Sequence, residues 1–374
     1  MPVPLPRDDQ ALLTAPDAQE VQLITRGVVS AVSAPSGPTQ LQQVLVGSLF
    51  KAMTGHEPEV GSLPPLDAEE LAVVLARRTE PFRRRILQVM ALTGLVVHPL
   101  PPQVAENLDR YAEAMSVHDD LLVAVRDLSA HSMALVQVDF DRNGYLREVA
   151  AGRGVAPAAG GDVWGLAEHD PTLAARWACL GELPASTVGR GVHDFYLARG
   201  FEFPGSPGSA PPLLAQHDWV HVLADYGTTV ESELEVFGFI ARANDDPRAF
   251  SLLAMVVSLF ETGALARGAG LFEADAGHLS KAGMAARLGD AMRRGAQCRG
   301  SNDFLAMDWF AVADRPVEVL RRELDLGPKD PRALDLGSVG PWEPGGISPY
   351  QWGSGQAKAE RDDRPYDSFG AELA

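Results

Sequence analysis

Cysteine is scarce in this sequence: its 374 residues include two, Cys179 and Cys298, which lie far apart. Two distant cysteines build neither a disulfide framework nor a multi-cysteine zinc site, and they are typical of a protein in a reducing compartment. The first residues have neither the basic and then apolar order of a secretory signal nor the acid-poor, Arg-rich composition of a transit peptide. We therefore expect a cytoplasmic protein.

Long apolar runs are also lacking. The richest apolar segment, residues 250–260, is interrupted by Ser251 and Ser258 and is shorter than the roughly 18 residues that a membrane-spanning helix requires. We expect a protein without a transmembrane helix, which makes at most peripheral contact with the inner face of a membrane.

Positive charge is low as well. The chain carries 32 Lys and Arg against 50 Asp and Glu, which gives a formal net charge of −18. Affinity for nucleic acid comes mainly from basic side chains that neutralise phosphates. We therefore expect no nucleic-acid partner, and we interpret the basic residues at 77–78 and 83–85 as a solvated helix face.

Apolar residues, in contrast, recur at spacings of three and four along much of the chain, which is the pattern of helices in a bundle. This periodicity predicts an all-α fold. In the first part of the chain, helices are predicted at about 41–54, 67–79, 81–94, 101–116 and 119–137.

Segments rich in Pro, Gly and Ser divide the chain into parts. We predict a poorly ordered leader with room for a short helix around 17–28, an N-terminal helical bundle, a flexible linker, a second all-helical domain, and a tail that is disordered or draped on the surface. In chain order, these five parts span residues 1–38, 39–150, 151–161, 162–326 and 327–374.

Residues that can bind a metal ion concentrate in the stretch 217–221, which reads His-Asp-Trp-Val-His. The imidazoles of His217 and His221 are four residues apart, so on a helix they project to one side about a turn apart. Glu233 follows twelve residues later, on the next predicted helix, and its carboxylate can complete a metal site with the two imidazoles.

Glu233 is predicted to lie on the apolar side of its helix. Glu231, Glu235 and Arg242 gather on the opposite side, as solvated charges would. The hydroxyl of Thr228 is expected to cap the start of this helix, with Glu231 completing a capping box. A buried ionised carboxylate is destabilising by several kcal/mol unless a cation compensates it, and two imidazoles with a divalent metal would do so.

Asp218 lies about 100° from His217 on the helical wheel. It is either a fourth ligand or an acceptor that orients an imidazole. A reading without metal also exists, in which hydrogen bonds satisfy both histidines and Glu233 pairs with an Arg. A His-x-x-x-His pattern alone does not decide between these readings.

Several motifs in order resemble the coenzyme Q biosynthesis protein 4 family. The family has a His-Asp-x-x-His block followed after eleven residues by Glu, as in 217–221 and Glu233 here. Upstream, residues 183–190 (Leu-Pro-Ala-Ser-Thr-Val-Gly-Arg) resemble its Leu-Pro-x-x-Thr-x-Gly segment. The resemblance covers about 165–330. Downstream, it includes 250–260, 307–309 and 316–324.

The resemblance implies a divalent metal, zinc first and iron second, at His217, Asp218, His221 and Glu233. It also implies an apolar cavity beside the metal for a prenylated quinone precursor or another isoprenoid lipid. Arg190 follows the Thr-Val-Gly motif and either faces an anionic group of this ligand with its forked donors or caps a helix. Peripheral membrane contact and quinone-biosynthesis enzymes as partners are implied too.

The implied role is in ubiquinone biosynthesis, either as a metal-dependent oxidative decarboxylase (a lyase) or as an organiser of the enzyme complex. In the first case Glu233 and Asp218 are the candidate catalytic residues. In the second, the protein is a non-catalytic lipid-binding scaffold with a structural metal. A third reading is a lineage-specific member that acts on another isoprenoid.

The chain departs from that family at two positions beside the predicted site: Asp225 and Ser232 stand where the family usually has Gly. The first 150 residues are also foreign to the family. In helix number and length, they resemble the helical domains of TerB-like tellurite-resistance proteins, and we interpret them as a docking or regulatory bundle.

Overall fold

The helices of this computed structural model confirm the predicted all-α fold. The described residues are 15–61, 63–97, 100–118, 122, 169–209, 212, 215–243, 253, 256–257, 261, 277–300 and 302–373. Within these ranges no strand forms, since the backbone bridges are isolated pairs. No helix in the same ranges is both long and apolar enough to cross a membrane. The predicted linker 151–161 and, apart from residue 122, the predicted helix 119–137 lie outside the described residues.

The N-terminal part is a bundle of helices. Its members are α1 (Ala18–Val32), α2 (Gln40–Thr54), α3 (Ala68–Val74), α4 (Glu80–Leu95) and α5 (Pro102–Ala114). Side-chain oxygens of Asp17, Thr39 and Asp67 accept hydrogen bonds from N–H groups in the first turns of α1, α2 and α3. A proline stands in the first turn of α4 and of α5, where its missing N–H needs no partner. These local signals explain why four of the five predicted helices form close to their expected positions.

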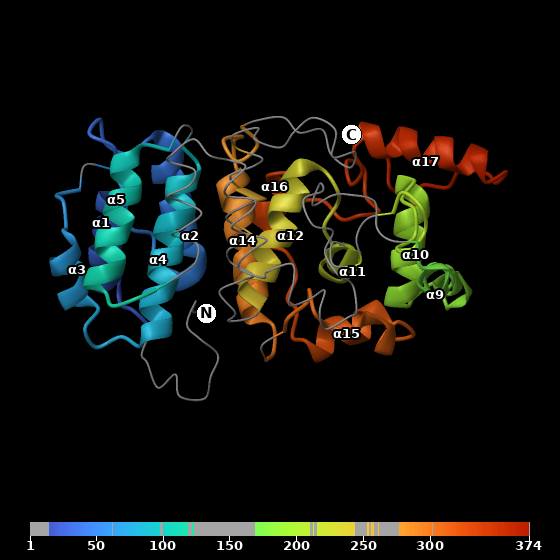
Figure 1. The fold of residues 1–374 in the computed structure, drawn as a ribbon, viewed down its shortest axis with the longest axis horizontal. Coiled ribbons are helices and arrows are strands. Elements are labelled where there is room, and N and C mark those ends of the chain that lie inside the picture. The colour runs from blue at the N-terminus through green and yellow to red at the C-terminus, as the bar shows by residue number, and fades with distance from the viewer. Residues whose placement is uncertain are drawn as a thin grey trace.

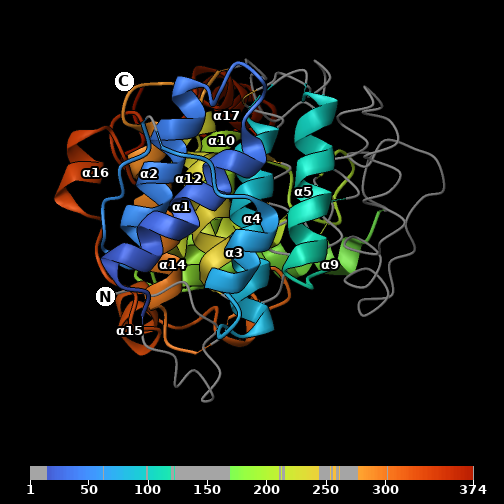
Figure 2. The ribbon, with the colours of Figure 1, turned by 90° about the vertical axis from the view of Figure 1, so that its left-hand side faces the viewer.

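The helix α1 is central to this bundle. It packs against α2, α3, α4 and α5 (Figure 2). The side chains of Val21, Ile24 and Val28 are completely buried there. The short helix predicted around 17–28 forms as α1. The poor order predicted for the leader 1–38 is wrong for residues 15–38, because apolar residues at helical spacing bring this segment into the core.

Two helices from the second half of the chain extend the same core. They are α12 (Val230–Ala243) and α14 (Met284–Gln297), and α14 packs against both α12 and α2 (Figure 1). Leu234, Leu288 and Met292 share one buried apolar cluster with α1, α2, α4 and α5. The N-terminal bundle and these two helices of the predicted second domain are therefore packed around one shared core.

The central position of α12 also buries charged side chains on this helix. Glu235 and Arg242 are predicted to be solvated, yet they are 1% and 3% exposed. Glu235 pairs with Arg287 of α14 at 2.5 Å, and Arg242 lines a small apolar cavity together with Phe82 of α4. The prediction of a solvated face is wrong because a helix between two others has no face left for solvent.

A second, aromatic core lies on the other side of α12. It is built by α9 (Pro171–Ala178), α10 (Val188–Arg199), α11 (Ala215–Ala224), α15 (Val317–Glu323) and the short 3-10 helices η1 (Cys179–Glu182) and η2 (Trp309–Ala311). The rings of Trp219 and Trp309 stack with centroids 5.5 Å apart, and Trp177 lies 5.5 Å from Trp219. This core surrounds α11 and places the predicted site in the interior.

The C-terminal tail is folded. It contains α16 (Pro331–Asp335) and α17 (Pro349–Arg361), and α17 begins with a capping box between Ser348 and Gln351. Gly200, at the left-handed end of α10 with φ of 71°, lies directly against the backbone of Ser354, where a Cβ would not fit. Of the two predicted alternatives for 327–374, disordered or draped on the surface, disorder is wrong for residues 327–373, because close backbone contacts hold the tail on α10.

We predict that Gly295→Ala destabilises the protein. A Cβ at Gly295 of α14 would meet the backbone carbonyl of Phe239 in α12 more closely than Cβ atoms approach any neighbour. Overpacking of this kind lowers the free energy of unfolding by about 1–3 kcal/mol, which outweighs the better helix propensity of Ala. Urea denaturation measures the effect. The control is Gly353→Ala on exposed α17, where nothing lies within 4 Å of the added atom, and equal stability of the two variants would contradict the prediction.

Candidate metal site

The helix α11 carries three of the predicted ligands and is buried on all sides. His217, Asp218 and His221 are 4%, 6% and 0% exposed. The helix ends at Ala224, and the N–H of Tyr226 donates to the carbonyl of His221 at 3.0 Å. The chain then turns directly into α12, which explains how a residue of the next helix reaches the imidazoles.

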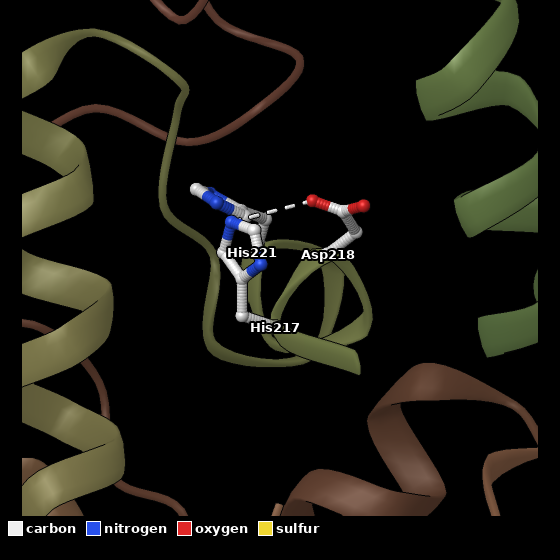
Figure 3. A group of neighbouring side chains, drawn as sticks. All are labelled: His217, Asp218 and His221. Carbon is white, nitrogen blue, oxygen red and sulfur yellow. Dashed lines mark ion pairs between the residues drawn. The ribbon is translucent and has the colours of Figure 1, made fainter. Parts of the chain in front are cut away.

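The side chains of this cluster converge on one region. The ligand atoms of His217, Asp218 and His221 lie within 4.8 Å of one another, and the Asp218 carboxylate is turned toward the imidazole rings (Figure 3). Glu233 of α12, which is 2% exposed, reaches both rings. Its Oε1 lies 3.3 Å from His221 Nε2, and its Oε2 lies 3.5 Å from His217 Nε2. His217 Nε2 is also 3.4 Å from Asp218 Oδ1.

These separations fit a shared cation. A direct N–H···O hydrogen bond is usually about 2.9 Å long, so distances of 3.3, 3.4 and 3.5 Å are long for such bonds. Two ligand atoms that each lie about 2.1 Å from one tetrahedral ion are about 3.4 Å apart. The buried His and carboxylate group could therefore hold a metal ion.

The hydrogen bonds of His221 support the same conclusion. Its Nδ1 lies 2.8 Å from the Gly227 carbonyl oxygen. A carbonyl accepts only, so Nδ1 carries a proton, and in the neutral form of this ring Nε2 presents a lone pair. This Nε2 and Glu233 Oε2 are both buried without a hydrogen-bond partner. A lone pair that faces a carboxylate needs a cation or a proton between them, and a divalent metal meets this need.

The protonation state of Glu233 suits a ligand. Burial alone would raise its pKa, but the positive charges and hydrogen bonds that His221 and His217 supply when they are protonated outweigh burial and lower the pKa to about 2. Burial raises the pKa of Asp218, while both histidines and Tyr196 oppose this rise. Glu233 is therefore the more acidic of the two carboxyls, and it is ionised at neutral pH.

Tyr196 of α10 is part of this cluster and was not expected. Its hydroxyl donates a hydrogen bond of 2.5 Å to Asp218 Oδ2, which leaves Oδ1 facing His217. Burial, followed by the Asp218 charge, raises the pKa of Tyr196 well above its usual value, so the hydroxyl remains a donor. Tyr196 comes from another helix, 22 residues from Asp218. No spacing rule could therefore have linked it to the site.

Arg190 lies at the start of α10 and has protein partners. Its Nε donates to the carboxylate of Asp194 at 2.8 and 3.0 Å, and its Nη1 donates to the Gly181 carbonyl at 3.1 Å. The neighbouring His193 contacts the same carboxylate at 3.1 Å. The proposed contact of Arg190 with an anionic ligand stays a prediction.

Asp225, one of the two departures from the resembled family, directly follows α11. Its φ of 64° is left-handed, a conformation that Gly adopts freely and that Asp tolerates better than most residues. Its carboxylate lies 3.8 Å from the Lys329 ammonium and directly against Gly340. These contacts are with the C-terminal segment, so Asp225 combines a backbone conformation that Gly adopts freely with a charge that faces Lys329.

Ser232, the second departure, belongs to the cap of α12. Its N–H donates to Thr229 Oγ1 at 3.3 Å, and the two hydroxyls lie 3.1 Å apart. The residue that caps α12 is therefore Thr229, and the prediction of Thr228 is wrong by one position. Thr228 is instead held by Gln351, to which its hydroxyl donates at 2.5 Å.

No family model, curated protein or solved structure matches this chain. The resemblances to the coenzyme Q biosynthesis protein 4 family and to TerB-like bundles therefore stay predictions. The fold and the site define the chain as an all-helical protein with a buried His and carboxylate cluster that could hold a metal ion.

We predict that Tyr196→Phe weakens metal binding about tenfold, because it removes the hydrogen bond that orients Asp218. Competition with a chelator measures the zinc affinity, and circular dichroism verifies the fold. Tyr350→Phe is the matched control, since Tyr350 is 47% exposed on α17. Equal affinities of the two variants would show that Tyr196 does not support the site.

Proposed function

We propose that this protein binds one divalent metal ion through His217, His221 and Glu233. Asp218 is either the fourth ligand or the acceptor that orients His217. The observation that supports this most is the buried lone pair of His221 Nε2, which faces the Glu233 carboxylate while Nδ1 is committed to the Gly227 carbonyl.

Zinc is the first candidate for the metal. Imidazole nitrogens and carboxylate oxygens are common zinc ligands, and the separations fit a four-coordinate ion. Iron is the second candidate, because two histidines and one carboxylate are also the ligand set of many non-haem iron sites. The identity of the metal follows from metal analysis of the purified protein.

The function we propose is in ubiquinone or related prenyl-quinone biosynthesis, with a prenylated quinone precursor or another isoprenoid lipid as the ligand. The support is the resemblance of 183–190, 217–221 and Glu233 to motifs of the coenzyme Q biosynthesis protein 4 family. The aromatic rings of Phe237 and Phe195 beside the imidazoles, with centroids 5.3 Å away in both cases, suit an apolar ligand.

In the catalytic form of this proposal, the protein is an oxidative decarboxylase of the precursor ring. A bound divalent ion would either activate molecular oxygen, the oxidant that this reaction requires, or polarise the ring carboxyl as a Lewis acid. Glu233 remains ionised, Tyr196 holds one oxygen of Asp218, and the burial of all three excludes water from the reacting group.

The alternative is a lipid-binding scaffold with a structural metal. A closed set of four ligands favours a structural role, whereas three ligands and an open position favour chemistry. The hydrogen bond from Tyr196 that turns Asp218 Oδ1 toward His217 favours the closed set. A lineage-specific member that acts on another isoprenoid remains a further alternative.

We predict that the protein purified from metal-supplemented cells contains about one equivalent of divalent metal, and that His221→Ala contains almost none. Elemental mass spectrometry measures both. His56→Ala is the control, because His56 lies in the N-terminal bundle beyond α2 and outside the cluster. The metal proposal fails if the wild-type protein is metal-free or if His221→Ala keeps its metal.

We predict that a prenylated quinone precursor co-purifies with the protein, as measured by mass spectrometry of extracted lipids. Another isoprenoid would select the lineage-specific alternative, and an absence of lipid would contradict every lipid-binding role. Glu233→Gln separates catalysis from scaffolding, since the two side chains have nearly the same shape. Loss of precursor conversion with intact fold and metal content would exclude the scaffold.

A further inference from the structure

The loop between α11 and α12 is held by the C-terminal segment. The N–H of Gly227 donates to the Val339 carbonyl at 2.9 Å, and the N–H of Thr228 donates to the Gly346 carbonyl at 3.0 Å. The same loop contains the Gly227 carbonyl that accepts the hydrogen bond from His221 Nδ1. One short loop therefore contacts a candidate metal ligand through a carbonyl and the tail through its N–H groups.

Arg199, the last residue of α10, joins the loop and the tail. It is completely buried, and its Nε donates to Thr228 Oγ1 at 2.8 Å. Its Nη2 donates to the carbonyls of Pro341 and Gly346, at 2.9 Å in both cases. The guanidinium also lies 4.0 Å from the centroid of the Phe195 ring. Neutral acceptors and a ring thus hold this buried cation between the two segments.

Glycines permit the close contact between loop and tail. A Cβ at Gly227 would lie 2.8 Å from the Gly346 Cα, closer than real Cβ atoms approach. A Cβ at Gly346 would clash with the carbonyl oxygen of Gly340 and would lie 2.9 Å from that of Glu343. The backbones of the loop and the tail therefore touch directly at Gly227 and Gly346. A methyl group added at Gly346 must rearrange the tail's own turn at the residue that contacts the loop.

We propose that residues 338–351, here named the C-terminal brace, position the Gly227 carbonyl and thereby fix His221 as a metal ligand. Arg199 and Gly346 are then positioning residues for the metal site. This inference rests on the proposed metal binding, and it adds a segment that lies beyond the region of family resemblance. Partners that orient a ligating imidazole typically change metal affinity 10- to 100-fold when they are removed.

The test uses the full-length protein and the metal alone. Gly346→Ala moves the brace without changing a ligand, and we expect its zinc affinity to fall 10- to 100-fold in competition with a chelator. The Co²⁺-substituted variant is expected to show a changed visible absorption spectrum, because the orientation of His221 changes. Gly353→Ala, also in the tail but in open space, is expected to match the wild type in both measurements.

A purely structural role of the brace would give a different result. It would lower the thermal unfolding temperature and leave the affinity and the Co²⁺ spectrum of the folded variant unchanged, which overturns the proposal. If Gly346→Ala does not fold, Arg199→Lys provides the same test, since it keeps the charge and loses the fork that joins Thr228 to the tail. Failure of the wild type itself to bind zinc or Co²⁺ would instead refute the proposed function.

Discussion

The hydrogen bond from His221 Nδ1 to the Gly227 carbonyl is the interaction on which the site depends. It commits one ring nitrogen to the backbone and leaves the other as a buried lone pair opposite Glu233. Two buried acceptors that face each other are unfavourable unless a cation or a proton joins them. Hence a contact between a side chain and a loop carbonyl, and not the His pair alone, makes this cluster one that could hold a metal ion.

The burial of this cluster follows from how α11 and α12 are packed. α11 is short and enclosed by aromatic side chains such as Trp219, while α12 has the N-terminal bundle on one side and α11 on the other. Glu233 can therefore face the imidazoles while Leu234, the next residue, belongs to the bundle core. The same enclosure explains why Tyr196 is needed at Asp218, whose carboxylate has little access to water.

Local periodicity was enough to predict most helices of the N-terminal bundle and the relation between His217, His221 and Glu233. Helical spacing puts the two imidazoles on one side of α11, and the short connection 225–228 turns the next helix back so that Glu233 faces them. Periodicity could not predict Tyr196 or the Gly227 carbonyl. The first comes from another helix, and a backbone carbonyl has no sequence signature. The tail was misjudged because its Pro and Gly content is typical of disorder, although Ser348 and Gln351 already formed a helix-start pattern. The solvent exposure of Glu235 and Arg242 depends on which other helices pack against α12, and a helical wheel of one helix does not show this.

The helices α2, α12 and α14 share one core, so the two halves of the chain depend on each other for burial of their apolar side chains. Leu234, Leu288 and Met292 would face water if the N-terminal bundle were removed, and the helix that carries Glu233 would lose one of its two supports. Neither half of the chain is then a module that can be exchanged independently. The bundle and the helix that carries Glu233 share one buried apolar cluster, so a change in the packing of the bundle acts directly on α12.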